Sequence, residues 1–163
     1  MRLEGSCHCG RVVFRLDSPT PCPYMRCYCS ICRKTAGGGG YAINLGGDAA
    51  SLEVEGREHV TVYHARLKDA EGQQTDSPAE RHFCRHCGSC LWAWDPRWPG
   101  LIHPFASAID TPLPQPPERV SIMLDSRANW CKAPQGAQER HFPAYPDESL
   151  ADWHRRHGLL ENG

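Results

Sequence analysis

The sequence predicts a mainly β fold that ends in one short helix. Apolar and polar residues alternate with the period of two that is typical of strands, for example in residues 12–16, 41–45 and 60–63. Proline and glycine clusters separate these segments. A capping-box sequence of the form Ser-x-x-Asp begins at Ser149, near the end of the chain. We therefore expect antiparallel strands with a short C-terminal helix.

The first half of the chain provides the strands before a long polar stretch. In residues 12–16 the apolar side chains share one face, and the three prolines within residues 19–23 end the strand. The glycine run 37–40 predicts a turn or hinge. Strand-like segments follow at residues 41–45, 52–54 and 60–63. The polar residues 69–80 predict an exposed loop.

The second half contains a strand, a cysteine turn and a second strand, which is the sequence form of a zinc ribbon. The strands are expected at residues 81–83 and 91–94, on either side of the segment 84–88. Prolines divide residues 96–117 into loops, and residues 120–124 form the last predicted strand. For the terminal helix, Leu150 and Trp153 fall on one face and Gly158 can end it.

Composition excludes several classes of protein. The chain has 163 residues, enough for one domain with its own core. Its 18 basic and 19 acidic side chains give a net charge of -1, so we expect neither nucleic acid nor membrane as a partner. The N-terminus has no apolar signal-peptide core, and no apolar run approaches the roughly 20 residues that span a bilayer. We expect a cytoplasmic protein.

Ten cysteines in a reducing compartment require an explanation other than disulfides. They cluster as C-x-C, C-x-C-x-x-C and C-x-x-C, spacings that let several sulfurs reach one metal ion. Thiolates favour zinc among the common metals. The sequence therefore predicts a zinc protein.

The central cysteine run predicts a metal site that is one ligand short. Three sulfurs leave one position of a tetrahedral zinc open, which is typical of catalytic sites, and they come from Cys27, Cys29 and Cys32. The negative charge of three thiolates weakens zinc as a Lewis acid toward water but still lets a substrate thiol enter the open position as thiolate. Arg33 and Lys34 either attract a carboxylate on that thiol or form a solvated turn. In the alternative, Cys22 closes the site.

Two distant pairs predict a second, closed site. Each pair precedes a glycine and offers two ligands, and together they give the four that a structural zinc needs: Cys7, Cys9, Cys84 and Cys87. Cys90 also stands in C-x-x-C spacing, with Cys87, but a strand follows it at once. We expect Cys90 and Cys131 to be buried thiols.

These motifs, in this order, resemble the glutathione-dependent formaldehyde-activating enzyme family, which includes the centromere protein V-like domains. The resemblance covers about residues 3–130 and leaves residues 131–163 as a C-terminal extension of a single domain 1–163. It implies a β-tent fold of antiparallel strands built around two zinc ions. It also implies that the four-cysteine set is structural and that Cys27, Cys29 and Cys32 are catalytic. Tyr28 departs from many relatives, which have a small or polar residue or histidine between the first two cysteines.

Two functions from different classes follow. The first is a zinc-dependent carbon–sulfur lyase or synthase. The resemblance implies glutathione and formaldehyde as its thiol and aldehyde, combining to S-hydroxymethylglutathione. The alternative is a non-catalytic zinc module that binds a partner protein. In this alternative both zinc ions are structural. Trp92, Trp94 and Trp98 either line a pocket or fill the core or the surface of the hairpin.

Overall fold

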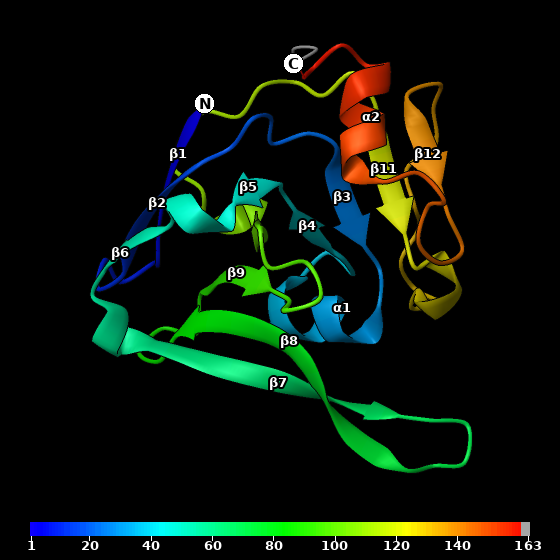
Figure 1. Ribbon diagram of the computed structural model, residues 1–163. Coiled ribbons are helices and arrows are strands. Elements are labelled where there is room, and N and C mark those ends of the chain that lie inside the picture. The colour runs from blue at the N-terminus through cyan, green and yellow to red at the C-terminus, as the bar shows by residue number, and fades with distance from the viewer. Residues whose placement is uncertain (161–163) are drawn as a thin grey trace.

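The computed structural model describes residues 1–160 and is mainly β, with two short helices, as predicted. The described residues form three sheets with two larger apolar cores and one small apolar cluster, and a long hairpin extends away from the body (Figure 1). Neither helix within the described residues is long and apolar enough to cross a membrane.

The first sheet contains three antiparallel strands near the N-terminus. Its order is β1 (Arg2–Ser6), β2 (Val13–Asp17) and β6 (Glu53–Glu55). The predicted strand at residues 12–16 is confirmed with a shift of one residue, and the side chains of Phe14 and Leu16 are fully buried. The sequence analysis missed β1, which pairs with β2 along its whole length.

The second sheet is antiparallel and has five strands. Their order is β5 (Gly47–Asp48), β10 (Leu101–Pro104), β9 (Cys90–Trp94), β8 (Gln74–Cys84) and β7 (Val60–Lys68). Strand β10 lies inside the proline-rich region that was predicted to form only loops. Strands β8 and β9 flank the cysteine turn as the zinc-ribbon pattern predicts.

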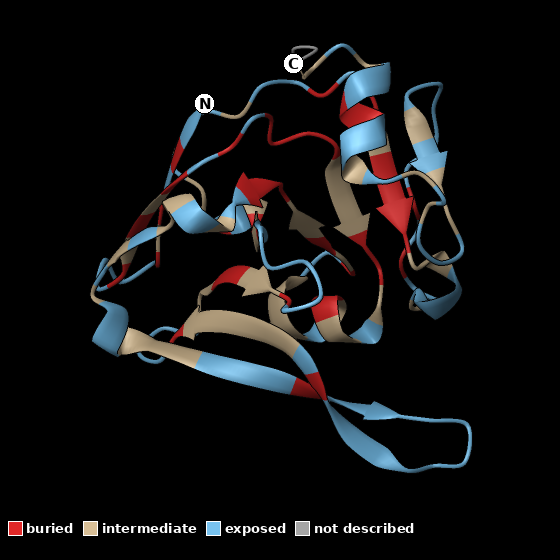
Figure 2. Cartoon of the chain, in the orientation of Figure 1, coloured by how far each residue is buried: buried red, intermediate tan, exposed pale blue. Residues whose placement is uncertain are grey.

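The prediction of an exposed loop at residues 69–80 is wrong in its secondary structure. Strand β8 begins at Gln74 and pairs with β7, so only residues 69–73 connect the two strands. The far half of this hairpin is exposed, with the exception of a few residues, and it extends from the body (Figure 2). A strand that buries neither face carries no apolar alternation, and its sequence therefore reads as a loop.

The third sheet has four strands and corrects the expectation of a purely antiparallel fold. Its order is β12 (Glu139–His141), β11 (Arg119–Ile122), β3 (Tyr24–Cys27) and β4 (Ala42–Asn44). Strand β11 runs parallel to both of its neighbours, and only β3 and β4 are antiparallel. Parallel strands must be joined by long connections, so they are far apart in the sequence. The alternation of apolar residues within one strand does not indicate which distant strand it pairs with.

Two helices accompany this sheet. The predicted C-terminal helix is α2 (Leu150–Arg156), where the Ser149 side chain accepts a hydrogen bond from the Asp152 backbone N–H and Gly158 takes a left-handed φ of 65°. Trp153 is buried and donates to Glu118 Oε2 at 2.9 Å. The other helix, α1 (Ser30–Ala36), was not expected, because the sequence suggested a single terminal helix.

The division of the domain into a core that ends at about residue 130 and a C-terminal extension stays a prediction.

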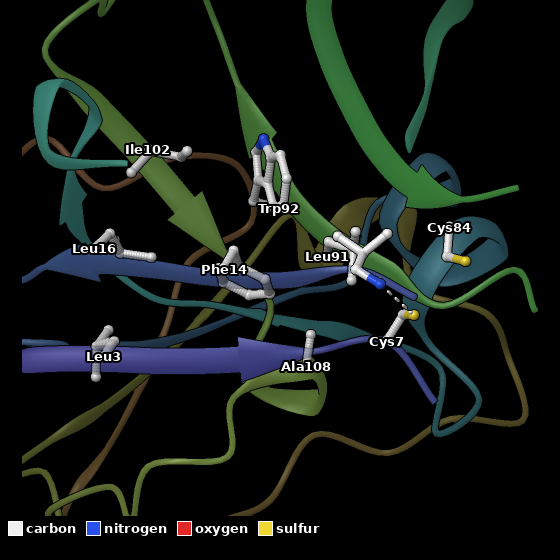
Figure 3. Close-up of a cluster of buried hydrophobic side chains, with 10 residues drawn as sticks. Leu3, Cys7, Phe14, Leu16, Cys84, Leu91, Trp92, Ile102 and Ala108 are labelled. Atoms are coloured by element: carbon white, nitrogen blue, oxygen red, sulfur yellow. Dashed lines mark hydrogen bonds between the residues drawn. The ribbon is translucent and has the colours of Figure 1, made fainter. Parts of the chain in front are cut away.

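The larger core lies between the first two sheets (Figure 3). Phe14 of β2 meets Trp92 of β9 edge-on, with ring centroids 5.1 Å apart. Cys7 and Cys84 stand together at one end of this core. Trp92 is therefore a core residue, as the second of the two interpretations of the tryptophans proposed. The core brings the ends of β1 and β8 together, and with them the first set of cysteines.

Candidate metal centre

The first cysteine cluster joins two distant parts of the chain. Its four sulfurs all lie within 4.8 Å of one another. Cys9 Sγ lies 3.5 Å from Cys7 Sγ and 3.7 Å from Cys84 Sγ, across a sequence separation of 75 residues. Two of the cysteines are buried and two are exposed. The cluster consists of Cys7, Cys9, Cys84 and Cys87, the set that the sequence analysis predicts.

Both halves of this four-cysteine cluster are built in the same way. Gly10 N–H donates to Cys7 O, and Gly88 N–H donates to Cys84 O, each at 2.9 Å. Both glycines have a φ of 72°, a left-handed conformation that other residues rarely adopt. The two glycines therefore turn the chain so that each pair of sulfurs points to one place.

Ser89 connects the two halves through its hydroxyl. Its Oγ accepts a hydrogen bond from His8 N–H at 3.1 Å and lies 3.3 Å from Cys87 Sγ. The hydrogen bond from this hydroxyl is the main reason that the pKa of Cys87 is lowered to about 5. A cysteine held as thiolate is ready to bind a metal.

Cys90 lies outside the four-cysteine cluster, and it is only half-buried, not buried as predicted. It stands on β9, and its Sγ donates to Thr35 O of α1 at 2.7 Å. Its side chain packs against the second core, near Cys27 and Cys32. The structure thus groups Cys84, and not Cys90, with Cys87.

The second cluster is local and sits at the junction of β3 and α1. Its sulfurs also lie within 4.8 Å of one another and belong to Cys27, Cys29 and Cys32. Cys27 ends β3, Cys29 is the N-cap of α1, and Cys32 lies in the first turn of that helix. Cys29 Sγ accepts a hydrogen bond from Cys32 N–H at 3.3 Å. The helix start therefore folds the three sulfurs toward one another.

Exposure within the three-cysteine cluster is uneven. Cys27 and Cys32 are only 5% and 4% exposed, whereas Cys29 is half-buried. Cys29 is therefore the most exposed of the three cysteines. The cluster packs against the second apolar core, which includes Phe105, Val120 and Ile122.

The three thiols cannot all ionise easily without a cation. Hydrogen bonds from Cys27 and Cys32 lower the pKa of Cys29. Hydrogen bonding with Cys29 and Cys32, together with burial, raises the pKa of Cys27, since a second negative charge beside the first is unfavourable. A bound divalent ion removes this conflict. An all-sulfur donor set suits zinc, so both clusters fit that metal.

Sequence reasoning missed one residue that contacts the three-cysteine cluster, Arg81 of β8. Its Nη2 donates to Cys32 Sγ at 3.5 Å, and its Nε is buried without a hydrogen-bond partner. The predicted strand 81–83 contained this residue, but the sequence alone could not show that the face of β8 carrying Arg81 meets α1. Arg33 of α1 also has a buried Nε without a partner, and Lys34 is exposed.

The remaining candidates lie elsewhere in the described part of the chain. Cys22 is buried but does not join the three sulfurs within 4.8 Å, and its carbonyl lies 2.6 Å from His154 Nε2. Cys131 is buried, as expected, and its Sγ donates to Gly39 O. Tyr28 packs beside Cys131 in a third small apolar cluster, so its ring turns away from its two cysteine neighbours.

Comparison with known proteins agrees with this geometry. The model of the glutathione-dependent formaldehyde-activating enzyme family matches residues 2–126. A curated protein from Halomonas elongata, named provisionally as a glutathione-dependent formaldehyde-activating enzyme, is 60% identical over 161 residues, covering 99% of both chains. A crystal structure of a Rhodobacter sphaeroides protein is similar with a TM-score of 0.52 and 26% identity, covering 70% of this chain and 92% of that one. The chain belongs to the glutathione-dependent formaldehyde-activating enzyme family.

Proposed function

We propose that this protein is a zinc-dependent carbon–sulfur lyase or synthase that acts on the adduct of glutathione and formaldehyde. The observation that carries the proposal is the three-cysteine cluster, which is one ligand short of four and in which Cys29 is only half-buried. The family name and the name of the Halomonas elongata relative support the two substrates.

The two clusters divide the roles. The four-cysteine cluster offers a complete ligand set and is assigned a structural zinc. The three-cysteine cluster is assigned a catalytic zinc, which when bound would hold a substrate thiol as thiolate at the open position.

All ten cysteines of the chain are free thiols, which supports a reducing compartment, and we place the protein in the cytoplasm.

The chain's own residues would orient the thiol. Arg33 and Lys34, on the helix that carries Cys32, offer two positive charges for the carboxylates of glutathione. In the reaction, a bond forms between the thiol sulfur and the aldehyde carbon, and the carbonyl π electrons move to oxygen. The thiol proton ends on that oxygen, so atoms and charge balance without an oxidant or reductant. The lyase direction is the reverse.

The test is exchange NMR on an equilibrium mixture of glutathione and formaldehyde, because the two combine without a catalyst. The zinc-loaded protein should speed exchange above the protein-free rate, and Cys29→Ser should return it to that rate. A matched control is Cys131→Ser, which changes a buried cysteine outside both clusters and should keep the acceleration. Exchange at the protein-free rate with the fully loaded wild type would reject the proposal.

A further inference from the structure

Arg81 lies on the face of β8 that looks toward the three-cysteine cluster. Its neighbours Glu80 and His82 point to the other face, where His82 Nε2 lies 3.3 Å from Glu80 Oε2. Across the sheet, Arg81 stands opposite Ala93 of β9, and Ala93 packs against the core that holds Cys27 and Cys32. The small Ala93 side chain leaves this face open for the long arginine side chain.

Arg81 contacts a thiol where many other arginines of this protein contact a carboxylate. Many arginines of the described residues pair with carboxylates, for example Arg15 with Glu4 and Glu55. Within residues 1–160, Arg81 has no aspartate or glutamate within ion-pair distance. The side-chain acceptor that it meets is Cys32 Sγ, at 3.5 Å.

A half-buried guanidinium needs a compensating negative charge, because burying an isolated charge is strongly unfavourable. Three thiolates around a divalent ion carry a net charge of -1, and the guanidinium carries +1. A hydrogen bond from a charged donor to a thiolate is also stronger than one between neutral groups. The arginine and a metal-loaded cluster would therefore stabilise each other.

We propose that Arg81 is the positioning residue of the three-cysteine site, holding Cys32 Sγ and offsetting the negative charge of the metal–thiolate unit. This inference rests on the metal site of the proposed function, but it does not depend on the carbon–sulfur chemistry. Partners of this kind outside the ligand set orient metal ligands, and their loss costs about 10–100-fold in metal affinity. We expect a loss of this size at one of the two sites.

The test uses the full-length protein loaded with ¹¹³Cd²⁺, whose NMR shift depends on the number and electron density of its sulfur ligands. Wild type should give two resonances, and Cys32→Ser identifies the one from the three-cysteine site. Arg81→Gln should move that resonance, leave the other in place, and make the three-cysteine site lose metal to a chelator at about 10–100-fold lower chelator concentration. Arg81→Lys keeps the charge but not the planar fork, so it should recover part of the affinity with a shifted resonance.

The matched control is Arg15→Gln, which removes an arginine from the exposed face of β2 and should leave both resonances unchanged. Wild-type resonances and chelator resistance in Arg81→Gln would overturn the inference, as would a three-cysteine site that takes up no cadmium. If Arg81→Gln does not fold, the lysine variant decides, and an unmoved resonance there rejects the role. Normal cadmium behaviour with no acceleration of exchange in wild type would instead reject only the proposed function.

Discussion

The two cysteine clusters offer the same sulfur ligands in opposite structural settings. The four-cysteine cluster draws Cys7 and Cys9 from the turn after β1, Cys84 from the end of β8, and Cys87 from the turn between β8 and β9. The three-cysteine cluster draws all its ligands from residues 27–32, where one helix begins. One cluster connects two sheets, and the other only shapes a local junction.

This difference explains why the two clusters should contribute differently to stability. A metal that joins segments 75 residues apart restricts the unfolded chain far more than one that joins near neighbours, by about 2 kcal/mol from loop closure alone. Cys7 and Cys84 also belong to the main core. We therefore expect a metal in the four-cysteine cluster to stabilise the fold more than a metal in the three-cysteine cluster does.

The largest expected effect comes from breaking the four-cysteine cluster. Cys84→Ser should cost more than about 4 kcal/mol of unfolding free energy or abolish soluble expression, since structural zinc can contribute on the order of 10 kcal/mol or more. The measurement is thermal unfolding, with Cys131→Ser as the control for a buried cysteine outside both clusters. An unchanged melting temperature in Cys84→Ser would show that this cluster does not hold the fold.

Breaking the three-cysteine cluster should separate activity from stability. Cys27→Ser, Cys29→Ser and Cys32→Ser should each remove the acceleration of thiol–aldehyde exchange while costing only about 1–3 kcal/mol, because their metal closes a short loop. Exchange NMR and thermal unfolding on the same samples give both values. Acceleration that survives the loss of all three cysteines would reject the mechanism, and a collapse as severe as that of Cys84→Ser would make both clusters structural.

Metal content offers a third comparison of the clusters. Elemental analysis of carefully reduced wild-type protein should give close to two zinc ions per chain, because the cysteines form one set of four and one set of three. Cys32→Ser should give close to one ion and keep the fold. A value near one in wild type would mean that only one of the clusters binds metal under these conditions.

The sequence was most informative where the pattern is local. The cysteine spacings, the apolar alternation of Phe14 and Leu16, and the capping serine Ser149 each depend on residues a few positions apart, and the structure has all three features. The family assignment depends on the order of these same motifs, and the comparisons confirm it.

The sequence was least informative where a distant neighbour decides the outcome. Strand β12 exists because β11 provides an edge, and helix α1 begins with a cysteine N-cap, which is not among the usual capping residues. The approach of Arg81 to Cys32 depends on which face of β8 meets α1, and no single segment encodes that choice. These features therefore depend on packing between distant segments, which local sequence patterns do not predict.

The smallest expected effect tests the turns that carry the four-cysteine cluster. Gly10 and Gly88 share a φ of 72°, and a Cβ at either position would meet no atom within 4 Å. Alanine there has no steric clash, so its cost comes from the left-handed backbone and should be about 1 kcal/mol at each site. Gly100→Ala is the control, because its Cβ also meets nothing and its φ lies outside the left-handed range.

Thermal unfolding of the three variants would measure this cost. Equal losses in Gly10→Ala and Gly88→Ala, with almost none in Gly100→Ala, would mean that the two halves of the cluster are equivalent turns. A loss of unfolding free energy several times larger in one of the two glycine variants would show that its turn does more than orient two cysteine side chains. That result would contradict the symmetry seen in the matching hydrogen bonds of the two glycines to Cys7 O and Cys84 O.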